Sequence, residues 1–334
     1  MLPRISLITP SFQQANYLEE CLTSVIDQGY PDLEHIVVDG GSTDGSKGII
    51  ERYAHSLHWW CSEPDQGQAH AINKGLAKST GQVFGWLNSD DTLLPGALQL
   101  VGKAFSEDPD LTIFEGARIM QDGEGHRTVQ PADDPADEQA LFSSPRINQQ
   151  STFYRSSIVH DLGGVDASLY CVMDVELWWQ LLFRHGTSGL RTTGEALAVF
   201  RIHGASKTDT AQELFVEETA GLLHALCCST GLEELAVILA MGHRFKPAAR
   251  PFPVGEAQRA RVEHMTVSFL LKWNRVVHTR QRFEALRRFV ASPYADPSRL
   301  STAERERVDL IKAQLDVPGW WAFRARRKWK HLFQ

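Results

Sequence analysis

The first hundred or so residues alternate short apolar runs with segments of helical periodicity. The apolar runs span 4–9, 33–38, 57–61 and 82–87, and the helical segments span 16–28, 46–54, 66–78 and 95–105. Strands separated by helices of about ten residues form parallel sheets with right-handed crossovers. The sequence therefore predicts an α/β fold, with a Rossmann-like, mostly parallel sheet and flanking helices.

Polar loops follow three of the predicted strands. Pro10-Ser11 follows the first strand, Asp39-Gly40-Gly41 the second, and Asn88-Ser89-Asp90-Asp91 the fourth. The carboxyl ends of parallel strands meet at one edge of a sheet, and ligands bind at that edge. The convergence of these loops indicates a nucleotide site there.

Asp90 and Asp91 are adjacent carboxylates at the mouth of a buried strand. Holding them together is costly unless a positive charge lies beside them. Mg²⁺ or Mn²⁺, which prefer oxygen ligands, would meet this need and would carry the diphosphate of a nucleotide. For an isolated Asp-Asp pair, a polar turn that caps the strand is the alternative.

The composition argues against several classes of protein. The chain has 334 residues, a formal net charge of -7 and a pI near 6.0, which argues against a nucleic-acid binder. Its 5 cysteines form no Cys-x-x-Cys pair, which indicates a reducing, cytoplasmic compartment and argues against a zinc site. Residues 1–6 lead into a strand rather than a signal peptide, and no apolar run reaches the length of about 18 residues that spans a membrane.

The rest of the chain divides into an irregular middle and a helical end. A helix is expected to begin near Met173, with Asp174 in its first turn, where the helix dipole favours a carboxylate even without a chemical role. Helical patterns dominate from 211 to 334. We therefore expect a catalytic domain over 1–210 and an α-helical appendage over 211–334.

An ordered set of short motifs resembles glycosyltransferase family 2, whose members have the GT-A fold. The resemblance covers about residues 4–208, and it rests on the order and spacing of the motifs. They are ITPSF at 8–12, VVDGGSTDG at 37–45, SEPDQG at 62–67, AINKG at 71–75, WLNSDD at 86–91, MDVELW at 173–178 and RIHGASKT at 201–208.

The resemblance implies a site for a nucleotide-sugar donor, most often a UDP-sugar. It assigns the contacts with the nucleotide to Thr9, Pro10, Ser11, Asp39, Asp65, Asn73, Lys74, Asn88 and Ser89. Within this group, Asp39 would accept a hydrogen bond from the base. Asn88 departs from the family's Asp-x-Asp pattern, because an amide supplies no negative charge, although its oxygen could meet ribose or metal-bound water. Asn88→Asp is accordingly expected to be tolerated.

The resemblance also implies a metal site and a catalytic base. Asp90 matches the metal-binding Asp, His203 would reach the diphosphate or the Mn²⁺ or Mg²⁺ ion, and Asp91 would support this metal group. Asp174 matches the base, although Met173 stands where the family often has Glu. Inverting transfer needs one carboxylate to take the proton of the acceptor hydroxyl and a metal to stabilise the departing diphosphate.

The expected acceptor is a glycan or a lipid-linked glycan in surface polysaccharide assembly, bound by the loops around 115–150 and by the helical appendage. Two other functions remain open. A nucleotidyltransferase that makes nucleotide sugars usually has a Gly-rich, basic loop after its first strand, and residues 9–14 contain no basic residue. A non-catalytic nucleotide- or sugar-binding module would lack the base or the metal ligand, and this chain has Asp90 and Asp174.

The segment 319–334 is basic and aromatic. On a helical wheel one face carries Trp321, Ala322, Ala325, Trp329, Leu332 and Phe333, and the basic face is interrupted by Trp320 and Phe323. This pattern is typical of a helix that lies on anionic lipid, which would place the protein peripherally on the inner face of the plasma membrane. A terminal helix docked on the protein is the alternative.

Overall fold

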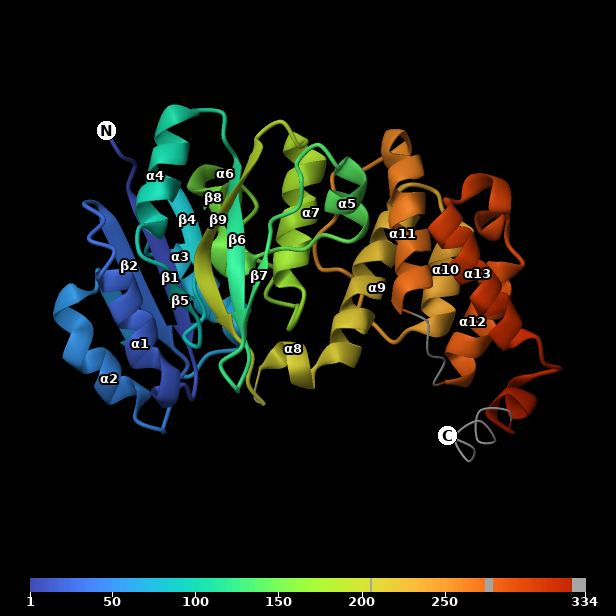
Figure 1. Ribbon diagram of the computed structural model, residues 1–334, viewed down its shortest axis with the longest axis horizontal. Coiled ribbons are helices and arrows are strands. Elements are labelled where there is room, and N and C mark those ends of the chain that lie inside the picture. The colour runs from blue at the N-terminus through green and yellow to red at the C-terminus, as the bar shows by residue number, and fades with distance from the viewer. Residues whose placement is uncertain (205, 274–278, 326–334) are drawn as a thin grey trace. The chain divides into compact units, whose positions relative to one another are not determined.

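The computed structural model describes residues 1–204, 206–273 and 279–325 (Figure 1). The chain forms two compact units. One contains Met1–Leu141 and Pro145–Gln212, and the other contains Phe142–Ser144 and the chain from Glu213 onward. That 1–210 and 211–334 are separate domains stays a prediction.

A single sheet forms the centre of the first unit. Its strands are β1 (Ile5–Ser11), β2 (Leu33–Asp39), β3 (Trp59–Ser62), β4 (Val83–Trp86), β5 (Thr92–Leu93), β6 (Ile113–Gln121), β7 (Arg127–Gln130), β8 (Thr152–Arg155) and β9 (Leu190–Arg201). The order is β3-β2-β1-β4-β8-β6-β9-β5, and β7 pairs with β6. Pairing is parallel from β3 to β4 and between β6 and β9. The β4–β8, β6–β8, β6–β7 and β5–β9 pairs are antiparallel, so the second half of the sheet is mixed.

Helices cover the sheet. They are α1 (Ala15–Ile26), α2 (Ser46–Tyr53), α3 (Gln68–Leu76), α4 (Ala97–Glu107), α5 (Glu138–Ser143), α6 (Ser156–Asp161), α7 (Met173–His185) and α8 (Lys207–Thr210). Side chains alternate between the faces of a strand. Ile5 and Leu7 of β1 therefore pack in one core cluster with residues of α1 and α4. Ile8 points to the opposite face, where it lies so close to Gly75 of α3 that a Cβ on that glycine would be 2.7 Å from it.

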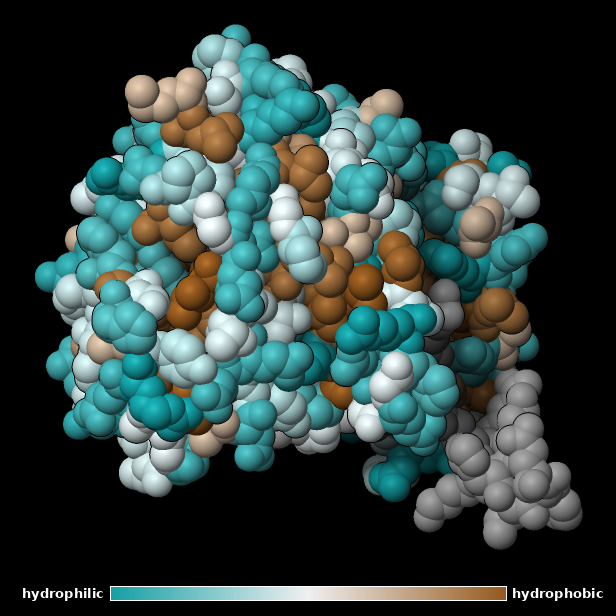
Figure 2. Space-filling model, turned by 60° about the vertical axis from the view of Figure 1, so that its left-hand side comes forward, coloured by the Kyte–Doolittle hydropathy of each residue, from teal (hydrophilic) through white to brown (hydrophobic). Residues whose placement is uncertain are grey.

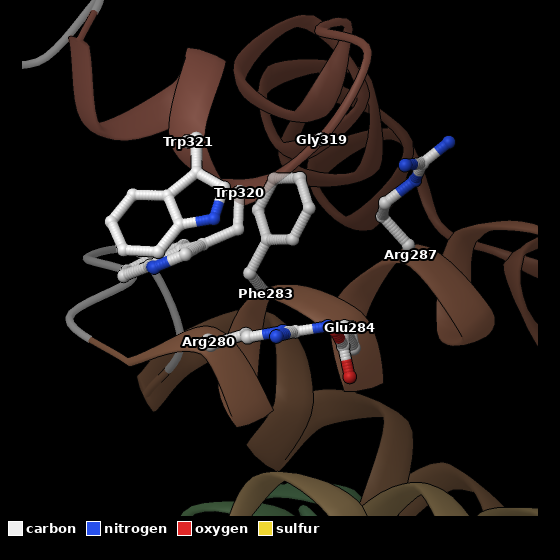
Figure 3. Close-up of a pocket in the computed structure, with 7 residues that line it drawn as sticks. All are labelled: Arg280, Phe283, Glu284, Arg287, Gly319, Trp320 and Trp321. Atoms are coloured by element: carbon white, nitrogen blue, oxygen red, sulfur yellow. The ribbon is translucent and has the colours of Figure 1, made fainter.

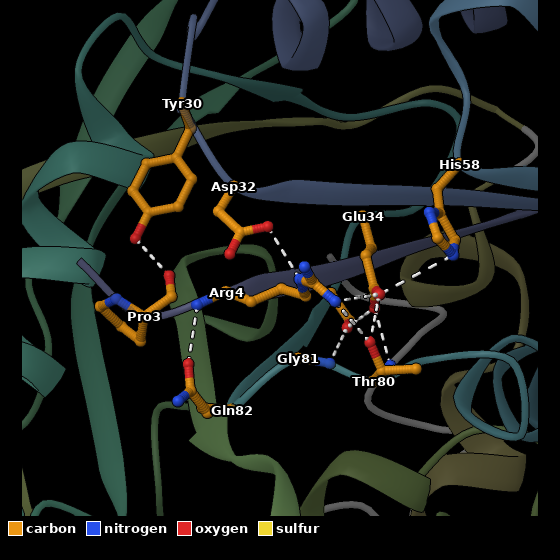
Figure 4. Close-up of polar contacts among 10 residues, drawn as sticks. Pro3, Arg4, Tyr30, Asp32, Glu34, His58, Thr80, Gly81 and Gln82 are labelled. Carbon is orange, nitrogen blue, oxygen red and sulfur yellow. Dashed lines mark hydrogen bonds and ion pairs between the residues drawn. The ribbon is translucent and has the colours of Figure 1, made fainter. Parts of the chain in front are cut away.

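A polar network lies at the amino ends of β1 and β2, away from the polar loops (Figure 4). The buried Glu34 accepts hydrogen bonds from the Ser6 hydroxyl at 2.6 Å and the Thr80 backbone N–H at 2.7 Å. Arg4 lies 3.5 Å from the same carboxylate and donates to Asp32 at 2.8 Å. Burial acts to raise the pKa of Glu34, but the hydrogen bonds from Ser6 and Thr80 and the nearby His58 outweigh it, and the pKa is lowered. The network ties the loop before β4 to β1 and β2.

The sheet also buries a carboxyl group, that of Glu115 on β6. It is 1% exposed, and its closest donor is the backbone N–H of Asn148 at 2.6 Å. Burial raises the pKa of Glu115 to about 8. The folded protein therefore holds a proton at Glu115 up to about pH 8, whereas the unfolded chain releases it near the usual value of about 4.3.

This difference predicts that Glu115 makes stability depend on pH. Because the pKa of Glu115 is raised in the folded state, Glu115 contributes most to the free energy of unfolding below about pH 4.3. This contribution falls as the pH rises, until the pH passes the folded-state pKa. Glu115→Gln should remove the effect. The unfolding free energy of the variant relative to the unmodified protein should rise by about 1.4 kcal/mol per pH unit between pH 5 and 7. Urea unfolding at each pH measures this, with the exposed Glu124→Gln as control, and parallel curves for Glu115→Gln would contradict it.

The second unit is helical. Its helices are α9 (Gln212–Ser229), α10 (Glu233–Gly242), α11 (Arg259–Trp273), α12 (Arg280–Val290) and α13 (Thr302–Leu315). Leucines and phenylalanines such as Leu226, Leu239, Leu270 and Phe289 are buried, as expected of core positions. None of the helices in the described ranges combines the length and hydropathy that crossing a bilayer requires.

Candidate functional site

The carboxyl ends of β1 and β2 form the first part of the candidate site. Ser11 pairs with Asp39 across the two strands, and Asp39 is fully buried. The Asp39 Oδ2 atom accepts from Ser62 Oγ at 2.7 Å and from the backbone N–H groups of Ser42 and Gly41 at 2.9 and 3.2 Å. Its Oδ1 atom accepts from Ser42 Oγ at 2.5 Å, the one such contact within the described part of the chain. Because a carboxylate oxygen offers about two acceptor positions, Oδ1 keeps one.

The end of β1 and the loop that follows it offer two features to a ligand. Among the described residues, the buried Ser11 hydroxyl has no hydrogen-bond partner. The Phe12 ring is 59% exposed and belongs to the small set of large hydrophobic side chains at the surface. On the face shown in Figure 2, hydrophobic residues reach the surface in small patches that are surrounded by hydrophilic residues. A Cβ on Gly40 would lie 2.9 Å from Asp65 Oδ2 and 3.2 Å from the Phe12 ring, so this glycine allows Phe12 and Asp65 to flank one point.

Other predicted nucleotide contacts are occupied by the protein itself. The Thr9 hydroxyl is 3.0 Å from Nε2 of His35, whose pKa burial lowers to about 3. The Asn73 amide donates to the Val165 carbonyl at 2.8 Å and accepts from the Val165 N–H at 2.9 Å. Lys74 forms an ion pair with Glu63 at 2.8 Å. Asn73 therefore anchors the loop around Val165, and Lys74 lies beside the 62–67 loop.

The loop after β4 brings Asp90 to His203. The Asp90 carboxylate lies 3.1 Å from His203 Nε2, and their side chains are 18% and 14% exposed. Tyr17 of α1 stacks on the His203 ring at 4.7 Å, which fixes the plane of the imidazole. The structure therefore brings together Asp90 and His203, which are 113 positions apart in the sequence, and their role as metal ligands stays a prediction.

Asp91 has a different environment from Asp90. It is fully buried, and its carboxylate accepts from the Arg201 N–H at 3.1 Å and from Gln150 Nε2 at 3.2 Å. Burial, reinforced by the charge of Asp90, raises the pKa of Asp91. Because its oxygens bond to other parts of the chain, Asp91 ties the loop after β4 to β9 and to Gln150.

The donor atoms of this site suit a hard divalent cation. Within the described ranges no three His, Cys, Asp or Glu side chains lie close enough together to hold a metal by themselves. Mg²⁺ and Mn²⁺ are commonly held by one or two protein groups together with water and substrate phosphates. Asp90 and His203 fit that arrangement, with a nucleotide diphosphate completing the ligand set.

Asp174 lies in the first turn of α7 and is partly buried. Its Oδ1 atom accepts from the backbone N–H of Val175 at 2.9 Å. Burial raises the pKa of Asp174, while the positive charges of Arg118 and Lys207 act in the opposite direction. Arg118 also acts electrostatically on Asp91, so its guanidinium lies near both Asp174 and the loop after β4.

Comparison with known proteins identifies the family. The model of Glycosyl transferase family 2 matches residues 6–170. The uncharacterized glycosyltransferase RP339 of Rickettsia prowazekii is 28% identical over 254 residues, which cover 73% of this chain and 77% of the relative. The chain belongs to glycosyltransferase family 2.

This family 2 glycosyltransferase also resembles a further relative and a solved structure. The putative teichuronic acid biosynthesis glycosyltransferase TuaG of Bacillus subtilis is 35% identical over 125 residues, which cover 36% of this chain and 50% of TuaG. The crystal structure of S. aureus TarS residues 1–349 in complex with UDP-GlcNAc has a TM-score of 0.61 at 16% identity, covering 94% of this chain and 90% of that TarS fragment. This likeness confirms the predicted GT-A fold.

Sequence reasoning missed several residues of this glycosyltransferase's site. Phe12 and Lys207 stand inside the recognised motifs, but their roles depend on neighbours that the motifs do not name. Lys207 donates to Gln68 Oε1 at 2.8 Å and to the Tyr170 carbonyl at 3.0 Å, and it lies 4.0 Å from the centre of the Tyr170 ring. Arg118 carries no motif signal, and its 3.3 Å contact with Gln150 joins segments 32 residues apart.

Proposed function

We propose that this glycosyltransferase moves a sugar from a UDP-sugar to a hydroxyl of a glycan or lipid-linked glycan, with inversion at the anomeric carbon. The Asp90–His203 pair carries this proposal, because it places a carboxylate and an imidazole 3.1 Å apart at the strand ends where nucleotides bind. Asp174, at the start of α7, supplies the base that such a transfer needs.

The nucleoside would bind between the loops after β1 and β2. The free Ser11 hydroxyl and the remaining acceptor position on Asp39 Oδ1 would receive polar groups of the nucleoside. Phe12 offers an exposed ring on which a base would stack, with Asp65 across Gly40 from it. Thr9, Pro10, Asn73 and Lys74 then shape this pocket mainly through the backbone and through contacts with other protein groups.

Asp90 and His203 would hold the metal ion. When bound, Mn²⁺ or Mg²⁺ stabilises the negative charge that develops on the departing diphosphate. Asp91 would keep the loop in place from its buried position, and Ser89 and Asn88 would complete the turn beneath the donor. Lys207 adds a further positive charge on this side of the site.

Asp174 would act as the general base. Its Oδ1 atom is held by the Val175 N–H, which leaves Oδ2 for the acceptor hydroxyl. As the hydroxyl oxygen bonds to the anomeric carbon, its proton moves to Oδ2 and the bond to the diphosphate oxygen breaks. Burial raises the pKa of Asp174, which makes the ionised carboxylate a better proton acceptor.

The relatives support a role in surface polysaccharide assembly. TuaG is named for teichuronic acid biosynthesis, and TarS has been crystallised with UDP-GlcNAc. We assign the acceptor to the loops around 115–150 of the first unit. The donor sugar is assigned only to the UDP class.

Release of nucleotide from a panel of sugar donors tests the function. A transferase should release UDP slowly from a UDP-sugar in water and faster when a suitable acceptor is added, with Mn²⁺ or Mg²⁺ increasing both rates. A nucleotidyltransferase would instead produce pyrophosphate from UTP and a sugar phosphate, and a binding module would release nothing. Either of these two results would overturn the proposal.

The C-terminal segment would add a contact with the membrane. Of residues 319–334, those from 326 onward lie outside the described residues. Phe323 is buried, and both Phe323 and Trp320 pack against Phe283 of α12 at 5.2 and 5.9 Å between ring centres. Phe283, Trp320 and Trp321 are among the side chains that line a hollow of about 280 Å³ (Figure 3). Trp321 is 73% exposed and therefore available to lipid.

We infer that this segment docks through Trp320 and Phe323 and meets anionic lipid through Trp321 and Arg324. This would hold a cytoplasmic enzyme on the inner face of the plasma membrane. Arg324→Gln should weaken binding to anionic vesicles about fivefold, since one basic side chain near such a surface contributes about 1 kcal/mol. Binding should also weaken as salt rises.

Vesicle co-sedimentation beside a melting curve measures this. Trp321→Ala should lower vesicle binding without lowering the melting temperature, whereas deletion of 319–334 should lower both, because it uncovers Phe283. The exposed Trp273→Ala serves as the control tryptophan. Equal sedimentation of the unmodified protein, Arg324→Gln and Trp321→Ala would remove the membrane role and leave docking alone.

A further inference from the structure

A chain of side-chain amides runs through the proposed donor site. Lys207 Nζ donates to Gln68 Oε1 at 2.8 Å, and Gln68 Nε2 donates to Asn88 Oδ1 at 2.6 Å. Asn88 Nδ2 then donates to Gln149 Oε1 at 3.3 Å, and Gln149 Nε2 donates to the Trp86 carbonyl at 2.6 Å. We call these five groups the amide relay.

Both ends of the relay fix its direction. An ammonium group only donates, so the Gln68 atom that faces Lys207 must be the oxygen. A backbone carbonyl only accepts, so the Gln149 atom that faces Trp86 must be the nitrogen. Starting from either end, Asn88 must accept from Gln68 and donate to Gln149. The orientation of the Asn88 amide therefore follows from the chemistry of its neighbours.

The relay needs an amide at position 88. A carboxylate there would still accept from Gln68, but it has no proton to donate to Gln149 Oε1. It would also lose the 3.5 Å contact in which Asn88 Nδ2 donates to Oδ2 of the buried Asp91.

We propose that the amide relay is a positioning device that couples Lys207 to the loop carrying Asp90, and that Asn88 serves in this relay rather than as a metal ligand. The inference rests on the proposed function, because Asp90 is assigned there to the metal. It reverses the expectation that Asn88→Asp is tolerated. Asn88, which replaces the first Asp of the Asp-x-Asp pattern, is the residue that the surrounding amides require.

Asn88→Asp tests the relay directly. We expect kcat/KM to fall at least about tenfold, in line with the loss of one buried hydrogen bond and the gain of a repulsion. The Mn²⁺ affinity measured with UDP should not increase. If Asn88 faced the metal, the added carboxylate would tighten Mn²⁺ binding and preserve turnover, and that result would overturn the proposal.

Gln68→Glu tests a relay residue that is not assigned to the metal or the substrate. Glutamate accepts from Lys207 but does not donate to Asn88, so we expect kcat/KM to fall about fivefold or more. Gln66→Glu places the same change two positions away on an exposed side chain and should stay within about twofold. Equal effects of the two substitutions would contradict the relay.

A double-mutant cycle that combines Gln149→Met with Asn88→Asp distinguishes a loss of the relay from a nonspecific loss of folding or activity. Alone, Gln149→Met should lower kcat/KM. In the Asn88→Asp background it should cause little further loss, because it removes the oxygen that repels the new carboxylate. Independent, multiplicative losses would overturn the proposal.

Melting temperatures without nucleotide keep this test distinct from the test of function. Asn88→Asp and Gln68→Glu should lower the melting temperature, and Gln66→Glu should not. If the unmodified protein released no UDP from any donor, the proposed function would fail, and these melting temperatures would still decide whether the relay exists. Unchanged melting temperatures in both relay variants would count against it.

Discussion

Asp174→Asn should lower turnover by about 10² or more while donor binding changes little. The amide keeps the shape of the carboxylate, and its oxygen still accepts from the Val175 N–H. It is not basic enough to take the acceptor's proton, and general base catalysis typically contributes 10²–10⁴-fold. Steady-state kinetics with separate measurement of UDP affinity distinguishes the loss of a chemical step from the loss of binding.

The exposed Asp161→Asn provides the matched control and should behave as the unmodified protein. Near-normal turnover in Asp174→Asn would show that another group takes the proton. Glu176, two residues further along α7, would be the first alternative, although it is 1% exposed and already accepts from Gln180.

Asp90→Ala should abolish detectable transfer, with a fall of about 10³-fold or more, because the metal supplies several kcal/mol of stabilisation to the departing diphosphate. The same substitution should remove the increase in UDP affinity that Mn²⁺ gives the unmodified protein. Without Asp90, His203 would be the remaining ligand of the proposed pair, and a single imidazole is a poor site for a hard cation.

Titration calorimetry with UDP, in the presence and absence of Mn²⁺, measures the effect of Asp90→Ala on binding. Asp110→Ala removes an exposed carboxylate from the same unit and is the control. If Mn²⁺ raised UDP affinity equally in Asp90→Ala and in the unmodified protein, the assignment of Asp90 to the metal would be wrong.

The first half of the sheet could be predicted from the sequence because its signals are local. The four predicted strands overlap β1, β2, β3 and β4, and the parallel β1–β2 and β2–β3 pairs follow from the helix between their strands, whereas β4 returns past them to pair with β1. The second half depends on long-range pairing. β8 inserts between β4 and β6 as an antiparallel strand, and β6 pairs in parallel with β9 across an irregular middle. No period in the sequence specifies those partners.

The candidate site shows the same limit. The motifs identified Asp90 and His203, and the structure brings them together. Motifs could not distinguish the accessible Asp90 from the buried Asp91, because that difference comes from contacts with Arg201 and Gln150 more than 50 residues away. The amide relay could not be predicted from the sequence for the same reason. Glutamines are common, and only the neighbouring groups in the folded protein determine which way each amide donates and accepts.

The C-terminal segment gives a further example. The helical wheel placed Trp320 and Phe323 as interruptions of a basic face, whereas the structure packs both of them on Phe283 and leaves Trp321 exposed. A wheel shows which side chains share a face, but it does not show which face has a partner.

The most direct test of the central claim is the effect of Mn²⁺ on UDP binding by the unmodified protein, followed as a thermal shift. The account predicts that UDP raises the melting temperature, that Mn²⁺ enlarges this rise, and that the enlargement disappears in Asp90→Ala. A melting temperature that UDP leaves unchanged with or without Mn²⁺ would contradict a UDP-sugar site at Asp90 and His203.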